Sequence, residues 1–183
     1  MNSSVLIELR TEELPPKSLK ALSESFADSV FSALREQAFA SSESSCTPYA
    51  TPRRLALVVT DVAERQPQRV IERKGPAVSS GVDAAGKPTK ALDGFMRSAG
   101  VAFEQLQRVG DGKAEYFVVR IEKNGEPLDK HLADIVTQAL KKLPIQKVMR
   151  WGDSEHQFVR PVHGLIMLHG ARVVPGGVLG LES

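Results

Sequence analysis

The sequence predicts an α+β fold, in which mixed or antiparallel strands pack with two longer amphipathic helices and with shorter ones. Two apolar stripes indicate the longer helices, because apolar residues recur at three- and four-residue steps over residues 16–38 and again over residues 128–143. Short runs rich in β-branched residues, next to Gly or Pro, indicate the strands between them. This mixture favours the α+β class.

Proline and glycine set the limits of the expected helices. Pro15 and Pro16 open the first helix, because a proline near the first turn loses no needed hydrogen bond. Pro144 ends the second long helix, and Gly100 ends a shorter one expected over residues 89–99. A further helical turn is expected around residues 103–106.

The strands follow from apolar runs of four to six residues. We expect strands at residues 5–9, 55–59, 70–74 and 116–121. Residues 165–168 and 172–174 predict a hairpin, and a further strand is expected to begin within residues 178–181. Residues 40–45 and 79–88 are predicted to be loops, because they are polar or rich in small residues. We expect one module over residues 1–183, or two lobes hinged near residues 76–90.

Bulk composition excludes several classes of protein. Hydrophobic residues make up 42% of the chain and charged residues 25%, and the formal net charge is +2, which permits a local basic patch without demanding one. The single cysteine, Cys46, forms neither an internal disulfide nor a cysteine zinc cluster. No apolar run reaches the roughly 20 residues that cross a bilayer, and no signal peptide is recognisable. A cytoplasmic protein is expected.

The segments Met149–Gly152 and Phe158–His163 hold the only tryptophan, two arginines and a histidine within fifteen positions. Tryptophan offers a stacking face and arginine a fork that binds phosphate, a combination suited to nucleic acid. The commoner alternative is a core indole beside a salt-bridging arginine. The residues alone leave both readings open.

Five separated motifs together resemble one known family. They are IELRTEELPPKSLKAL near the start, ATPRRLAL at 50–57, ERKGPAV at 72–78, KKLPIQKVMRWG at 141–152 and the following FVRPVH. In this order they are similar to the beta subunit of bacterial heterotetrameric glycyl-tRNA synthetase. The resemblance covers the N-terminal part of that subunit, so an N-terminal fragment of a larger protein is expected.

The resemblance implies a role in the ATP-dependent attachment of glycine to tRNA. In that family the separate alpha subunit carries the class II catalytic core, where glycine, ATP and Mg²⁺ meet, while the beta subunit supports assembly and tRNA recognition. It therefore implies no catalytic residue, metal or cofactor within this chain. The implied partners are the alpha subunit, the remainder of the beta subunit and the glycine-specific tRNA, with no membrane.

Six basic residues are the candidates for contact with tRNA phosphates, because Lys and Arg supply most sequence-independent affinity for nucleic acid. The alternative is that they are solvated or form salt bridges with Glu12, Glu13 or Glu72. Trp151 is a stacking platform if exposed and a core anchor if buried. The six candidates are Arg53, Arg54, Arg73, Lys74, Arg150 and Arg160.

Other motifs favour ordinary structural roles. Gly81–Lys87 has the glycine and lysine spacing of a phosphate-binding loop, but Pro88 stands where Ser or Thr should bind magnesium, so a connecting turn is predicted. Glu12 and Glu13 are expected to cap the following helix. The two hypotheses that remain are a module that contacts tRNA and a purely structural protein–protein assembly module with no RNA contact. An independent hydrolytic site is disfavoured, because no nucleophile or metal set is present.

Overall fold

The chain divides into two compact units in the computed structural model, which describes residues 2–83, 86–110 and 114–183. The first unit comprises Met1–Pro67 and Glu126–Ser183, and the second comprises Gln68–Gly125. The chain therefore passes between units at residues 67/68 and 125/126. Residues 76–90 lie within the second unit, and a hinge there stays a prediction. Each unit is described by itself below.

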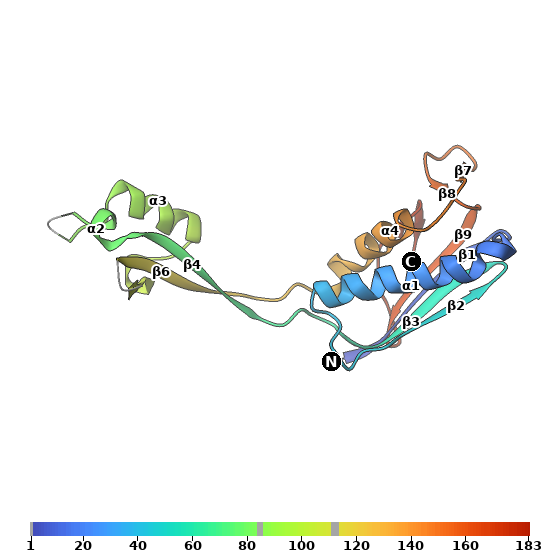
Figure 1. Cartoon of the computed structure of the whole chain (residues 1–183), viewed down its shortest axis with the longest axis horizontal. Coiled ribbons are helices and arrows are strands. Elements are labelled where there is room, and N and C mark those ends of the chain that lie inside the picture. Colours follow the sequence, from blue (N-terminus) through green and yellow to red (C-terminus); the bar gives the residue numbers. More distant parts are fainter. Residues whose placement is uncertain (1, 84–85, 111–113) are drawn as a thin grey trace. The chain divides into compact units, whose positions relative to one another are not determined.

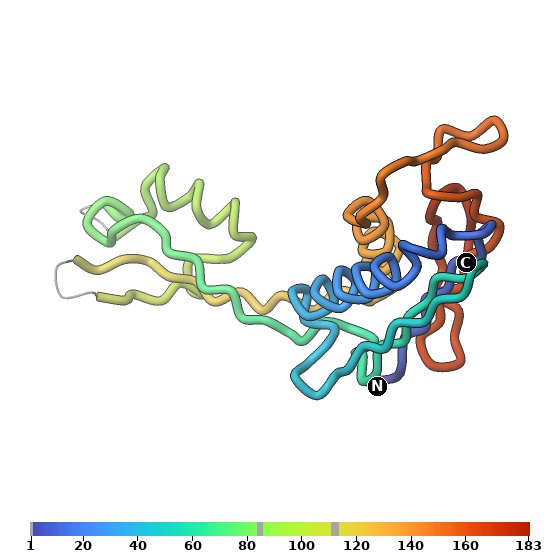
Figure 2. The backbone as a smooth tube through the Cα atoms, turned by 45° about the vertical axis from the view of Figure 1, so that its right-hand side comes forward, coloured from blue at the N-terminus to red at the C-terminus, as the bar shows by residue number. Residues whose placement is uncertain are grey.

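A five-stranded antiparallel sheet forms the centre of the first unit. Its order is β10-β9-β1-β3-β2, so β1, the first strand of the chain, lies between β3 and β9. Figure 2 shows the late strand β9 running beside β1. The bounds are β1 Asn2–Thr11, β2 Cys46–Thr51, β3 Arg54–Ala63, β9 Val162–His169 and β10 Arg172–Val173.

One face of this sheet is buried. Ile7 of β1 pairs with Leu57 of β3 and with Met167 of β9, and all three side chains are 0% exposed. The buried positions alternate along β1, as expected for a sheet with one covered face. The covering elements are α1 (Leu19–Glu36) and α4 (Leu132–Lys141), which pack against each other. Figure 1 shows α1 beside the sheet.

The two apolar stripes form these helices. A short 3-10 helix at Pro16–Ser18 precedes α1, whose buried residues include Phe26 and Val30. Another at Leu128–Lys130 precedes α4, whose buried residues include Ile135 and Leu140. The stripes therefore lie on the core side, as predicted. The second helix is shorter than its stripe, because its first turn is 3-10 and it ends before Pro144.

Two small hairpins complete the first unit. Strand β7 (Met149–Arg150) pairs with β8 (Gln157–Phe158), and β11 (Gly177–Val178) pairs with β12 (Leu181–Glu182). The expected single strand within residues 178–181 is wrong. Leu179 and Gly180 instead form a two-residue turn with φ values of 54° and 77°, as type I′ hairpins require.

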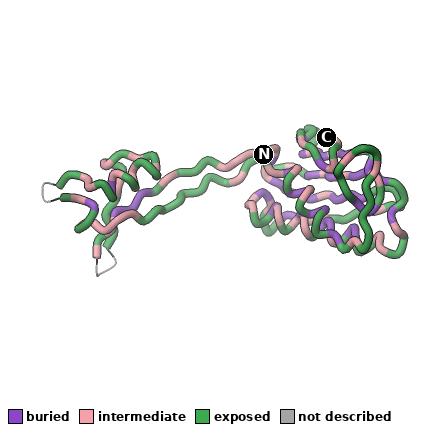
Figure 3. The backbone as a smooth tube through the Cα atoms, turned by 90° about the horizontal axis from the view of Figure 1, so that it is seen from above, coloured by how far each residue is buried: buried purple, intermediate pink, exposed green. Residues whose placement is uncertain are grey.

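The second unit is a three-stranded antiparallel sheet of order β4-β6-β5 with two helices. Figure 3 shows buried segments within this unit as well as within the first. Leu92 of α3 and Phe117 and Val119 of β6 supply its buried side chains. Gly100 ends α3 in the left-handed conformation, at φ 69°, as predicted. The bounds are β4 Arg69–Ala77, α2 Val78–Gly81, α3 Lys90–Ala99, β5 Gln107–Gly110 and β6 Glu115–Lys123, with a 3-10 turn at Phe103–Gln105.

Across the residues that the structure describes, no helix combines the length and the apolar character that would let it span a membrane. Over the same residues, no three or more His, Cys, Asp and Glu side chains are grouped to hold a metal ion.

Candidate nucleic-acid interface

Three segments that are far apart in the sequence meet at one end of the five-stranded sheet. Thr11 donates its backbone N–H to the carbonyl of Arg53 at 3.0 Å, and Glu12 donates to the carbonyl of Pro161 at 2.9 Å. Leu14 donates in the same way to the carbonyl of Pro52 at 2.7 Å. The end of β1, the turn before β3 and the start of β9 are thereby joined by backbone hydrogen bonds, which places their charged side chains close together.

Arg53 and Arg54 lie at the start of β3 with their side chains largely in solvent. Arg53 forms an ion pair with Glu13 at 3.7 Å, and Arg54 forms one with Glu8 at 3.2 Å. The two arginine side chains are 66% and 58% exposed, respectively. Ion pairs in such exposed positions contribute only about 0–1 kcal/mol. Both guanidinium groups are therefore accessible to a second anion.

Arg160 is held in place more firmly than its two neighbours. Its Nε donates to the backbone carbonyl of Glu13 at 3.0 Å, and one terminal nitrogen donates to the carbonyl of Val159 at 3.1 Å. Arg160 and Arg53 both line a hollow of about 460 Å³, with Glu12, Glu13, Leu14, Pro15 and Pro16. The hollow thus combines two guanidinium groups with two carboxylates on the protein surface.

Sequence reasoning missed two further groups at this end of the sheet. Arg10 of β1 pairs with Arg54 across the sheet, and its side chain lies over Gly164, where an added Cβ would be 3.4 Å from the Arg10 Cδ. His163 Nε2 lies 2.9 Å from Glu12 Oε1. Alternation along β1 could have identified Arg10, since it faces the same side as Glu8. We call Arg10, Arg53, Arg54 and Arg160 the sheet-end cluster.

The remaining candidates of the first unit lie elsewhere. Arg150 is on β7 and pairs with Glu155 at 3.6 Å. Trp151 is half-buried and packs against the core of the first unit, an arrangement that suits a core anchor better than an exposed platform. The alternative of arginines in salt bridges, which the sequence left open, is therefore observed for Arg53, Arg54 and Arg150.

Arg73 and Lys74 belong to β4 in the second unit. One terminal nitrogen of Arg73 donates to the Ser98 carbonyl at 3.0 Å, and the guanidinium lies 5.9 Å from the centroid of the Phe95 ring. The Nζ of Lys74 lies 3.5 Å from the Tyr116 ring centroid, a close cation–π contact. The structure thus separates the six candidates into four of the first unit and two of the second.

Two other motifs resolve into structural features. The expectation that Glu12 and Glu13 cap the helix is wrong, because neither lies in the first turn of the 3-10 helix or of α1, and both pair with basic side chains instead. Around Gly81–Lys87, Asp83 donates its N–H to the Lys87 carbonyl at 2.9 Å between α2 and α3. Ala84 and Ala85 of this motif lie outside the described residues.

Comparison with known proteins places the chain among the aminoacyl-tRNA synthetases. A sequence model of the family described as "Glycyl-tRNA synthetase beta subunit" matches residues 5–183. The chain therefore belongs to the glycyl-tRNA synthetase beta subunit family, as its five motifs predict.

Curated relatives agree with this assignment. The chain is 49% identical over 183 residues to a glycine–tRNA ligase beta subunit of Neisseria meningitidis serogroup B, a match that covers 100% of the chain and 26% of that relative. It is 50% identical over 180 residues to that of Neisseria gonorrhoeae, covering 98% of the chain and 26% of the relative. The Haemophilus influenzae subunit (strain PittGG) is 47% identical over 178 residues, covering 97% and 26%. The chain thus spans about a quarter of the length of these relatives.

Proposed function

We propose that this chain is a non-catalytic part of a glycine–tRNA ligase and that its sheet-end cluster contacts the phosphate backbone of the glycine-specific tRNA. In this proposal the enzyme is a heterotetramer and the alpha subunit supplies the catalytic core, which binds ATP and Mg²⁺. The observation that carries the proposal is the meeting of three family motifs at one end of the sheet, each of which contributes at least one arginine.

The chemistry of the cluster supports contact with phosphate rather than with a specific base. Arginine presents a planar fork of donors that matches phosphate oxygens in pairs. Arg53 and Arg54 are more than half exposed and are held only by surface ion pairs. A phosphate can displace those carboxylates at small cost, because such pairs are weak in water. Arg160 is already oriented by two backbone carbonyls, so it loses little freedom on binding.

Replacing Arg53 and Arg54 together by Ala tests this proposal. We expect the tRNA affinity of the whole enzyme to fall on the order of tenfold, given about 0.2–1 kcal/mol for each exposed charge pair. The slope of log affinity against log salt should become shallower by roughly 1.4–1.8, since each lost phosphate contact releases fewer counterions. Filter binding or fluorescence titration at four salt concentrations measures both quantities.

A second double substitution, Lys17→Ala with Lys20→Ala, is the matched control. It removes the same charge from the first unit, at the N-terminal end of α1, outside the sheet-end cluster, and the Lys20 side chain is 87% exposed. We expect it to change neither the affinity nor the salt slope by more than about one third of the arginine effect. Equal affinities and slopes for the arginine variant and the unmodified enzyme would refute the tRNA contact.

Assembly with another protein is a second candidate role, and one observation favours it. Val148 and Met149 are large apolar side chains that are 53% and 41% exposed, respectively. Exposed apolar groups of this kind next to a hollow are typical of protein interfaces. Because Val148 lines a hollow apart from the sheet-end cluster, the two roles are compatible in one chain.

A further inference from the structure

A hollow of about 630 Å³ opens between α4, the β7–β8 hairpin and the β11–β12 hairpin of the first unit. Its floor is apolar, because Leu140, Phe158 and Val178 line it and are buried in the core. The volume lies within the range of about 300–1,000 Å³ that is common for binding pockets. The hollow shares no lining residue with the sheet-end cluster.

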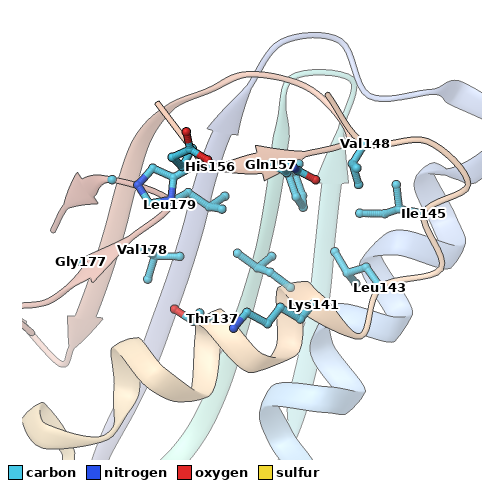
Figure 4. Close-up of a pocket in the computed structure, with 14 residues that line it drawn as sticks. Thr137, Lys141, Leu143, Ile145, Val148, His156, Gln157, Gly177, Val178 and Leu179 are labelled. Atoms are coloured by element: carbon cyan, nitrogen blue, oxygen red, sulfur yellow. The ribbon is translucent and has the colours of Figure 1, made fainter. Parts of the chain in front are cut away.

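The hollow has a polar end and an apolar end. Figure 4 shows Thr137 and Lys141 on α4 across from His156, whereas Leu143, Ile145 and Val148 lie together at the other end. Within the described part of the chain, Lys141 and His156 make no hydrogen bond or ion pair with another residue. They are therefore available to an acceptor on an incoming molecule.

Charge around the hollow is predominantly positive. Lys141 and Lys142 end α4, Lys147 lies in the loop that follows, and Arg150 is on β7. Among the described lining residues Glu155 is the only carboxylate, and its charge is offset by Arg150 at 3.6 Å. An occupant with carboxylates beside its apolar groups complements this arrangement.

The wall beside His156 is built on an unusual turn. Leu179, a bulky residue, holds φ at 54° in a turn position where Asn or Gly is preferred, and its side chain lines the hollow. The neighbouring Gly180 lets the imidazole approach closely, since a Cβ there would lie 2.8 Å from His156 Nε2. Backbone strain of this kind is concentrated at sites that bind other molecules.

We propose that this hollow docks an acidic, amphipathic segment of the other subunit of the synthetase, the alpha subunit. The segment places apolar side chains against Leu143, Ile145 and Val148 and directs a carboxylate to Lys141. A protein segment fits better than a small molecule, because the apolar surface continues outside the hollow onto Met149, which is 41% exposed. The choice of the alpha subunit rests on the proposed function, in which this chain is part of a heteromeric enzyme.

Two substitutions in the full-length beta subunit test the docking. Val148→Asp puts a charge at the apolar end, and Lys141→Glu reverses the charge at the polar end. We expect each to weaken the affinity for the alpha subunit, measured by isothermal titration, at least tenfold. Lys141→Arg should restore it to within twofold of the unmodified protein. The matched control is Val173→Asp on β10, because Val173 is 52% exposed and Val148 is 53% exposed, and Val173 does not line the hollow.

The same variants separate this proposal from the tRNA contact. Val148→Asp should leave tRNA affinity of the beta subunit unchanged, whereas Arg53→Ala with Arg54→Ala should leave affinity for the alpha subunit unchanged. Unchanged affinity for the alpha subunit in both hollow variants would overturn the docking. So would a loss of thermal stability of the isolated beta subunit with unchanged alpha affinity, because that result would assign the hollow to a segment of the same chain.

Discussion

Arg53, Arg54 and Arg160 illustrate what the position of a single residue adds to its identity. All three are arginines near apolar runs in the sequence, but the structure ties Arg160 to two backbone carbonyls and leaves the other two in exposed ion pairs. Lys74 and Arg73 differ again, because each lies against an aromatic ring. A basic residue is therefore a candidate for phosphate contact only to the extent that its surroundings orient it and leave it accessible.

Cys46 is predicted to be an unreactive thiol. Burial raises the pKa of the Cys46 thiol from 9.0 to about 11, and the charge of Asp28 adds to the effect. At pH 8 the reactive thiolate is then about 100-fold scarcer than in the unfolded chain. We expect Ellman's reagent to react at least about tenfold more slowly with the folded protein than with the protein in urea.

The pH dependence of Cys46 has a defined sign. Because the folded pKa is raised, the folded state holds its proton more tightly than the unfolded state between pH 9 and about 11. The thiol therefore lowers stability as the pH rises through that window and has no effect at neutral pH. Equal reaction rates for folded and unfolded protein at pH 8 would contradict the burial of this side chain.

At the scale of elements, the core of the first unit depends on the fit of α1 to the sheet. Phe26 and Val30 of α1 are 0% exposed and belong to the same apolar cluster as Leu57 and Met167 of the sheet. By contrast, β2 is an edge strand of six residues that contains Pro48. Proline is tolerated at an edge because a ladder hydrogen bond can be spared there.

Replacing Phe26 by Ala is expected to lower the free energy of unfolding by about 3–5 kcal/mol, because it leaves a cavity where the ring is 0% exposed. Urea unfolding followed by circular dichroism measures the change. Lys20→Ala on the same helix is the control, since that side chain is 87% exposed, and it should alter stability by no more than about 0.5 kcal/mol. A similar small change for both variants would show that α1 does not anchor the core.

At the scale of the whole molecule, the two units have separate cores. Every member of the large apolar cluster lies in the first unit, whereas Leu92, Phe117 and Val119 are buried in the second. Where the chain leaves and re-enters the first unit, Gln66 donates its N–H to the Glu126 carbonyl at 3.0 Å and Leu128 donates to Glu64 at 2.9 Å. The ends of the first unit are thus already joined by hydrogen bonds.

The first unit is therefore expected to fold without the second. We predict that replacing residues 68–125 with a short Gly/Ser linker leaves a cooperative urea transition, because the linker needs only to close a gap that hydrogen bonds already span. Phe26→Ala should cost the shortened chain the same free energy as it costs the full chain. A non-cooperative transition, or loss of circular dichroism, would show that the second unit is needed for the fold of the first.

Much of the fold could be predicted from local pattern. The stripes of α1 and α4, the cores of β1, β3, β4, β6 and β9, and the β9–β10 hairpin follow from the spacing of neighbouring apolar residues and from Pro and Gly at their ends. Strands β2 and β5 were not predicted, because most of their side chains are polar or exposed and carry no clear alternation. The hairpin at Leu179–Gly180 was missed because leucine is unusual in such a turn.

By itself, the sequence determined the α+β class and, through its five motifs, the synthetase family, because both depend on residue types at fixed spacing along the chain. Only the tertiary structure decided which distant residues become neighbours. Hydrogen bonds between separate segments join residues 11–14 to residues 52, 53 and 161 and thereby assemble the sheet-end cluster. The same long-range packing divides the chain after Pro67 and forms the hollow beside α4, features that no local pattern records.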